Sequence, residues 1–351
     1  MTDGTVSGLT GGVEYQAVST VGRVGKELRT VLSGAPQEPP TFGRVRLGVE
    51  SSGSAFATDG LARFSRDVFG DGEGVAVVRN AGASGFDLRI EVADTGTRIA
   101  ARWRPGRREQ VLSRVMKARQ RLLLAQALIH YPALWQASQF VDDHPGGHGS
   151  FGVPLAGCLL QIGGKGVLLT GPSGVGKSTL VGQEIAAGAI AVSDNLLVLD
   201  PARHIAHGVV EPVRADFSLL PPGVATPIPG RKTTHGRGEG HLNYREGWSA
   251  IDAVVLLRRT GATPGGTAAA PEAAARELAA ATYTAGELRR YWPLAAALAV
   301  ATGRGPVHPA ITESTRRLCE AVPCLELELG SRPGARLEDT LSDLESAPAW
   351  T

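Results

Sequence analysis

The sequence has few lysines and no long apolar run, and both shortages exclude classes of protein. Only five of its 36 basic residues are lysine, and the formal net charge is +2. So small a charge does not predict nucleic acid or an acidic membrane as a partner. No apolar run approaches the roughly 20 residues of a membrane-spanning helix, and the first residues lack the pattern of a signal peptide. We therefore expect a cytoplasmic protein that binds neither nucleic acid nor membranes.

Cysteine is also scarce. Cys158, Cys319 and Cys324 are too few and too scattered for a disulfide framework, which indicates a reducing compartment. No two of them have the spacing typical of zinc ligands. His144 and His148 lie in the Gly-rich stretch "DDHPGGHG", whose composition favours a joint between domains over a metal site.

The 351 residues, 42% of them hydrophobic, suffice for one large domain or two ordinary ones. Residues 1–40 are polar and rich in Gly, Ser and Thr, which predicts a flexible segment. Residues 41–145 combine strand-like stretches with a helical pattern from Glu109 to Tyr131, and we expect Pro132 to end that helix. This part predicts a small α+β module, followed by a second domain over residues 150–346.

The second domain is predicted to be α/β with a mixed sheet. Gly163 and Gly164 separate two apolar stretches and indicate a hairpin. Residues 260–271 are typical of an exposed linker. We expect helices near 272–302 and 309–321, a strand at 324–329, and a last amphipathic helix on Leu337, Leu341 and Leu344.

The stretch "GPSGVGKS" matches the phosphate-loop pattern G-x-x-x-x-G-K-[ST] at every fixed position, between an apolar strand and a helix. Its glycines allow the backbone to curl so that successive N–H groups face inward. Lys177 supplies a charge for the β- and γ-phosphates, and Ser178 offers a hydroxyl to Mg²⁺. The motif predicts ATP and Mg²⁺ as cofactors. The predicted nucleotide-binding residues are Gly171, Ser173, Gly174, Val175, Gly176, Lys177, Ser178 and Thr179.

Phosphoryl transfer also needs a carboxylate that holds the metal or receives the acceptor's proton. Asp194 in "AVSDNLLVLD" lies sixteen residues after Ser178, one helix and one short strand later. That path returns the chain to the sheet beside the phosphate loop, so Asp194 is our candidate base and second metal ligand. Ser193 and Asn195 beside it are also good turn formers, so the alternative is that Asp194 serves only as a turn residue. Asp200 is the rival acid, although Pro201 beside it indicates a turn.

Residues 156–200, "AGCLLQIGGKGVLLTGPSGVGKSTLVGQEIAAGAIAVSDNLLVLD", resemble the catalytic core of the HPr serine kinase family, whose fold is akin to phosphoenolpyruvate carboxykinase. The paired strands before the loop match, as does the ungapped distance from Ser178 to Asp194. The resemblance implies a mixed-sheet P-loop kinase domain of the HPr-kinase type. It also implies that Asp194 acts as base toward an acceptor hydroxyl and lies near the metal.

The chain departs from that family at three positions. The second of two adjacent acids is Asn195 here, the usually acidic residue after the first loop glycine is Pro172, and a family histidine is Ala156. The family's signature segment for the reverse reaction has no clear counterpart. These differences favour a diverged kinase with another acceptor, without the reverse activity.

Basic residues supply further candidates. Arg214 and Glu211 lie in "EPVRAD", and the later Gly-rich loop contains Arg231, Lys232, His235 and Arg237. Such a loop could close on the transferred phosphate or on an anionic acceptor, or it could be a solvated charged loop. We take Arg214 and Lys232 as catalytic candidates beside Asp194 and Lys177.

Together these patterns predict an ATP-dependent kinase. Its acceptor is a hydroxyl of a small metabolite or a Ser or Thr of a peptide or protein, and the 41–145 module is the natural place for acceptor recognition. A homo-oligomer is compatible with the sequence. A non-catalytic nucleotide sensor, or an ATPase with a decayed site, is the main alternative. A transport ATPase lacks support because no "LSGGQ"-like segment follows the loop, and a nucleoside monophosphate kinase would carry the loop near its start.

Overall fold

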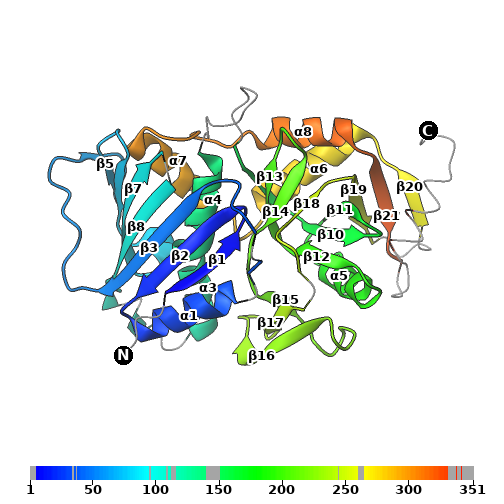
Figure 1. The fold of residues 1–351 in the computed structure, drawn as a ribbon, viewed down its shortest axis with the longest axis horizontal. Helices are drawn as coiled ribbons and strands as arrows, with labels where there is room; N and C mark the ends of the chain where they lie inside the picture. The colour runs from blue at the N-terminus through cyan, green and yellow to red at the C-terminus, as the bar shows by residue number, and fades with distance from the viewer. Residues whose placement is uncertain are drawn as a thin grey trace. The chain divides into compact units, whose positions relative to one another are not determined.

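A computed structural model describes residues 5–33, 35–36, 38–94, 96–107, 110–111, 116–139, 151–243, 245–259, 265–330, 337 and 341. By their contacts the residues divide into two compact units. Unit 1 comprises Met1–Gly152, Arg231–Gly236 and Gly286–Pro309. Unit 2 comprises Val153–Gly230, Arg237–Ala285 and Ala310–Thr351. Both contain sheet and helix, and the chain is a mixed α/β protein (Figure 1).

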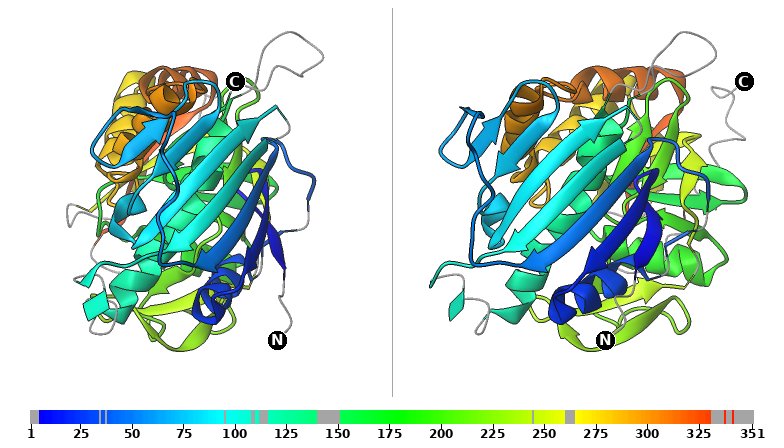
Figure 2. Two further views of the ribbon diagram at one scale, coloured as in Figure 1. Left: turned by 90° about the vertical axis from the view of Figure 1, so that its left-hand side faces the viewer. Right: turned by 60° about the vertical axis from the view of Figure 1, so that its left-hand side comes forward.

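Unit 1 is built on an eight-stranded mixed sheet in the order β1-β2-β3-β8-β7-β6-β5-β4. β2 pairs with β3 and β3 with β8 in parallel, and the other neighbours are antiparallel. The long central strands lie side by side (Figure 2). The strands are β1 (Val6–Thr10), β2 (Val13–Ser19), β3 (Arg44–Ser51), β4 (Ala62–Arg63), β5 (Val68–Gly70), β6 (Val75–Val78), β7 (Phe86–Ala93) and β8 (Gly96–Trp103).

The start of the chain corrects the sequence-based expectation. Residues 1–40 were predicted to be flexible, whereas β1, β2 and helix α1 (Gly22–Leu32) occupy most of this stretch. Val13, Tyr15 and Ala17 alternate with less buried residues, so β2 buries one face. The Gly, Ser and Thr content hid this period-two pattern.

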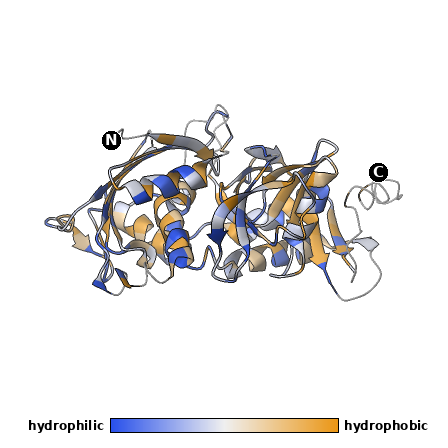
Figure 3. Ribbon diagram, turned by 90° about the horizontal axis from the view of Figure 1, so that it is seen from below, coloured by the Kyte–Doolittle hydropathy of each residue, from blue (hydrophilic) through white to orange (hydrophobic). Residues whose placement is uncertain are grey.

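Helices cover one face of this sheet, which curves around them when seen from below (Figure 3). Helix α3 (Lys117–Ala125) passes through a π turn, η2 (Gln126–His130), into α4 (Tyr131–Ser138). Pro132 was expected to end a helix here, but it is the second residue of α4. Proline has no N–H for the carbonyl of Leu128, four residues earlier, and that carbonyl accepts the hydroxyl of the buried Tyr15 instead. Unit 1 also contains the short helix η1 (Ala81–Ala83).

A late segment of the chain completes unit 1. The helical pattern of residues 272–302 is two helices, α6 (Pro271–Thr284) in unit 2 and α7 (Tyr291–Thr302) in unit 1. The N–H of Gly72 donates to the carbonyl of Ala301 across 2.9 Å. Residues 286–309 therefore pack in unit 1, although sequence analysis assigned them to the domain of residues 150–346.

Unit 2 contains the main sheet, with the order β12-β10-β11-β19-β21-β20. β11, β19 and β21 are parallel, whereas β10 is antiparallel to both β11 and β12. β12 therefore runs in the same direction as β11. The strands are β10 (Cys158–Ile162), β11 (Lys165–Thr170), β12 (Ile190–Ser193), β19 (Ala253–Arg258), β20 (Gly265–Ala268) and β21 (Cys324–Glu328).

Two connecting segments next to this sheet can be compared with the sequence-based predictions. The hairpin between β10 and β11 is confirmed, and Gly163 and Gly164 have the positive φ angles, 57° and 82°, that such a turn requires. The predicted linker is partly wrong, because residues 265–268 form the edge strand β20 on β21. Backbone pairing at a free edge needs no strand-like side chains.

Two smaller sheets complete unit 2. Their orders are β18-β14-β13-β9 and β15-β17-β16. No helix within the described residues is long and apolar enough to cross a membrane. The strands are β9 (Val153–Ala156), β13 (Leu196–Asp200), β14 (Ile205–Gly208), β15 (Val213–Ala215), β16 (Ala225–Lys232), β17 (Gly238–Leu242) and β18 (Trp248–Ala250).

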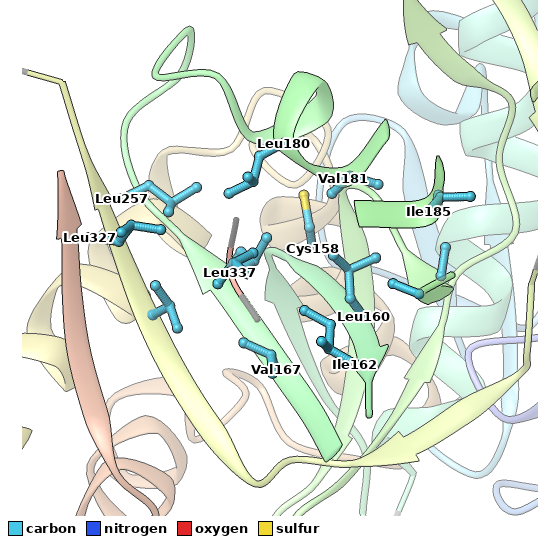
Figure 4. Packing of buried hydrophobic residues seen from close by; sticks show 14 of the residues in the cluster. Cys158, Leu160, Ile162, Val167, Leu180, Val181, Ile185, Leu257, Leu327 and Leu337 are labelled. Carbon is cyan, nitrogen blue, oxygen red and sulfur yellow. The ribbon is translucent and has the colours of Figure 1, made fainter. Parts of the chain in front are cut away.

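The helices of unit 2 are α5 (Lys177–Ala186), α6 and α8 (Ile311–Ala321). Leu180, Val181 and Ile185 of α5 pack against the apolar side chains of the main sheet (Figure 4). Leu337 lies in the same cluster, and its N–H donates to the buried carboxylate of Glu184 on α5 across 2.8 Å. The predicted last helix falls largely outside the described residues, and so does Leu344.

Candidate active site

The phosphate loop joins β11 to α5, as predicted from its sequence. Gly171, Gly174 and Gly176 have φ angles of 148°, 84° and 120°. These lie in the region that side chains other than glycine rarely adopt. A Cβ at Gly171 would also lie 2.8 Å from the carbonyl oxygen of Leu257 on β19. The first glycine is therefore required both by its φ angle and by the neighbouring parallel strand.

The amine of Lys177 folds back over this loop. Its Nζ donates to the carbonyl oxygens of Gly171 across 2.7 Å and of Pro172 across 3.0 Å. Partial burial lowers the pKa of Lys177, which the nearby Cys158 partly offsets. Ser178 and Thr179 are half-buried at the first turn of α5. Positive charge and the helix start thus coincide in one place, which suits a phosphate group.

Two contacts fix the middle of the loop. The side chain of Val175 is buried in the main core, and its N–H donates to the carbonyl of Pro172 across 3.3 Å. Its own carbonyl accepts Nε of Arg259 across 2.9 Å. Sequence reasoning missed Arg259. The available signal was its place directly after β19, the strand parallel to the one that leads into the loop.

Asp194 follows β12 in a tight turn. The hydroxyl of Ser193 donates to the carbonyl of Leu196 across 2.6 Å, and the N–H of Asn195 donates to Ser193 Oγ across 3.2 Å. The N–H of Gly157 donates to the carbonyl of Asn195 across 2.9 Å. This stretch therefore forms a turn, as its residues also predicted, and Asp194 lies within that turn.

Strand direction and one side chain connect Asp194 to the phosphate loop. β12 and β11 run the same way, so Asp194 and Gly171 follow strands that end at the same edge of the sheet. Cys158 of β10, the strand between them, donates from Sγ to the carbonyl of Asp194 across 2.9 Å. Burial raises the pKa of the Cys158 thiol, Asp194 raises it further, and Lys177 lowers it. Both charged groups therefore act on this one thiol.

The carboxyl group of Asp194 lies near three charged side chains, of which Glu211 is buried. Burial raises its pKa to about 6, and the charge of Glu211 also raises it, while Arg245 and Arg214 lower it. Burial lowers the pKa of Arg245, against the effect of Asp194 and Glu211. A carboxyl group with a pKa of about 6 can still lose its proton at neutral pH and is more basic than an ordinary aspartate, which suits a general base.

Glu211 and Arg245 complete this cluster. Glu211 accepts Nδ2 of Asn195 across 2.8 Å and Nη2 of Arg214 across 2.9 Å. Arg245 donates to the carbonyl of Val209 across 2.8 Å. Arg245 was missed by sequence reasoning because it lies between strands, and only a bridge from its backbone to Ala191 of β12 brings it to the site.

The other candidates have different surroundings. Asp200 ends β13, and its Oδ1 accepts the N–H groups of Ala202 and Arg203, as a turn residue does. Arg231 forms a paired ion contact with Glu27 of α1, within unit 1.

Lys232 also belongs to unit 1, where its carbonyl accepts Nη2 of Arg121 across 3.1 Å. Its side chain is exposed, and its catalytic role stays a prediction. His144 and His148 lie outside the described residues.

The candidate metal ligands fit a cation that arrives with the nucleotide. Among the described residues, no three His, Cys, Asp or Glu side chains gather as a metal-binding group. Mg²⁺ usually keeps several waters and takes one or two protein ligands beside substrate phosphates. The hydroxyl of Ser178 and the carboxylate of Asp194 suit that limited role.

Comparison with known proteins finds distant likenesses among solved structures. No protein-family model and no curated protein match the sequence. Among solved structures, the chain is similar to the Hpr(Ser) kinase/phosphatase from Coxiella burnetii, with 19% identity and a TM-score of 0.22. The match covers 32% of this chain and 69% of the other. At that level the function has to be argued from the site itself.

Proposed function

We propose that the protein is an ATP-dependent kinase of the HPr-kinase type that transfers the γ-phosphoryl group to an alcohol hydroxyl. The acceptor is a small metabolite or a Ser or Thr of a peptide or protein. The observation that carries the proposal is the position of Asp194. Its carboxyl group, with a pKa raised to about 6, follows a strand that ends at the same sheet edge as the phosphate loop.

Each residue has a role in this reaction. The N–H groups of the loop and the amine of Lys177 bind the phosphates, and Asp194 accepts the proton of the acceptor hydroxyl. The acceptor oxygen then forms a bond to the γ-phosphorus as the bond to the β-phosphate oxygen breaks, so that ADP leaves. Ser178 and Asp194 would hold Mg²⁺, which neutralises phosphate charge when bound. Arg214 stabilises charge near Asp194, and a catalytic role of Lys232 stays a prediction.

A phosphorylation screen tests this function. Purified protein with Mg²⁺ and ATP labelled at the γ-phosphate is offered a panel of alcohols and of Ser- and Thr-containing peptides. We expect labelling of one class, and Asp194→Asn should lower kcat by roughly 10²- to 10⁴-fold. Binding of ATP should survive this change, because the phosphate loop is intact. Lys177→Ala should weaken ATP binding on the order of 10- to 100-fold, as expected for lost charge-assisted bonds.

Asp200→Asn is the matched control, because Asp200 is a buried acid that ends the next strand and serves its own turn. It should leave turnover unchanged. Two results would contradict the proposal: full turnover in Asp194→Asn, or tight ATP binding with no acceptor labelled and no ATP consumed. The second result would identify a nucleotide sensor.

A further inference from the structure

Glu211 is a buried carboxylate outside both of the motifs that the sequence makes visible. Its side chain is 3% exposed and lies shortly before β15. One of its oxygens accepts Nδ2 of Asn195 across 2.8 Å, and the other accepts Nη2 of Arg214 across 2.9 Å. A buried carboxylate is costly unless it is paired and hydrogen-bonded in this way.

The contact with Asn195 connects Glu211 directly to the candidate base. Asn195 follows Asp194, and its N–H and carbonyl are bonded to Ser193 Oγ and to the N–H of Gly157. The remaining polar group of Asn195 is its side-chain amide, and this amide donates a hydrogen bond to Glu211. The turn that presents Asp194 is therefore fixed from β12, from the start of β10 and from the segment before β15.

Glu211 itself is held by a second contact. Arg214 of β15 donates to its other oxygen across 2.9 Å, so the buried carboxylate has one amide and one guanidinium partner.

We propose that Glu211 is a positioning residue: through its hydrogen bond to Asn195 it holds the turn that presents Asp194. This inference rests on the proposed function only for its effect on catalysis. The effect on the geometry of the turn is independent of any reaction.

The proposal also explains why residue 195 is an asparagine. The atom that meets Glu211 at 2.8 Å must be a donor, and an aspartate there would bring two carboxylates together. Like charges so close are strongly unfavourable. Asn195 is then the hydrogen-bonding complement of Glu211 and not a mark of decay.

An exchange of the amide and the carboxylate between positions 195 and 211 tests the contact between them. Asn195→Asp alone should lower thermal stability and turnover, because it sets two carboxylates against each other. The double variant Asn195→Asp with Glu211→Gln restores a donor opposite an acceptor and keeps the number of charges. It should therefore be more stable and more active than Asn195→Asp alone, and the double-mutant cycle should show coupling.

A double variant whose losses of stability equal the sum of the two single losses would overturn the inference. If the cycle shows coupling in thermal stability but no acceptor is ever labelled, the proposed kinase activity fails while the role of Glu211 stands.

Discussion

The thiol of Cys158 donates a hydrogen bond to the backbone carbonyl of Asp194 across 2.9 Å. Cys158 belongs to the strand that precedes the phosphate-loop strand, and it is fully buried. The contact therefore ties the turn that carries the candidate base to the core of the sheet. A buried cysteine of the core thus also supports the site.

Loss of this thiol should affect both stability and turnover. Cys158→Ala removes a buried donor and leaves a carbonyl without it, which should cost about 1 to 2 kcal/mol. Cys158→Ser keeps a donor and should retain more of the turnover. Urea unfolding and kcat are the measurements. Cys324→Ala, a buried cysteine of β21, is the control and should lower stability without changing kcat.

The raised pKa of Asp194 predicts opposite effects of pH on activity and stability. Turnover should rise as pH increases through about 6, because the base must be ionised. The folded pKa lies above the ordinary value of 3.8, so the folded state binds more protons between pH 4 and 6. The contribution of Asp194 to stability is therefore lost as pH rises through this window. Asp194→Asn should stabilise the protein more at pH 7 than at pH 4, as measured by urea unfolding at both values. If Asp194→Asn changed the free energy of unfolding equally at pH 4 and pH 7, the raised pKa of Asp194 would be contradicted.

Arg259 is predicted to support nucleotide binding through the loop backbone. Its Nε is bonded to the carbonyl of Val175, and a Cβ at Gly176 would lie 2.9 Å from one of its terminal nitrogens. Arg259→Ala should weaken ATP binding on the order of tenfold, as for a lost charge-assisted bond. Isothermal titration calorimetry measures this. Arg276→Ala, an exposed arginine of α6, should bind ATP normally, and an unchanged affinity in Arg259→Ala would refute the role.

Gly208 is predicted to be irreplaceable for steric reasons. A Cβ there would lie 1.9 Å from the carbonyl oxygen of Val192, two residues before Asp194. Gly208→Ala must shift β12 or β14, which should cost roughly 1 to 3 kcal/mol and displace Asp194 enough to lower kcat. Gly265→Ala in the edge strand β20 meets no atom within 4 Å and is the matched control. Thermal unfolding and kcat of the two variants give the comparison.

Much of unit 2 could be predicted because its signals are local. The phosphate loop, the hairpin at Gly163 and Gly164, and the place of Asp194 after a short strand all depend on near neighbours in sequence. β20 and the insertion of α7 into unit 1 could not be predicted, because both depend on which free edge or face a distant segment meets. The first strands were missed for a different reason: their alternation was readable, but Gly and Ser obscured it.

The sequence by itself determined the curved glycine-rich loop between β11 and α5 and the acid that follows it at a fixed distance. It could do so because backbone curvature and strand–helix alternation are short-range properties. The tertiary structure alone decided the surroundings of that acid. Glu211 and Arg214 lie on one segment and Arg245 on another, and their approach to Asp194 exists only after the chain has folded. The motif therefore predicts a nucleotide, whereas the folded cluster sets the protonation of Asp194.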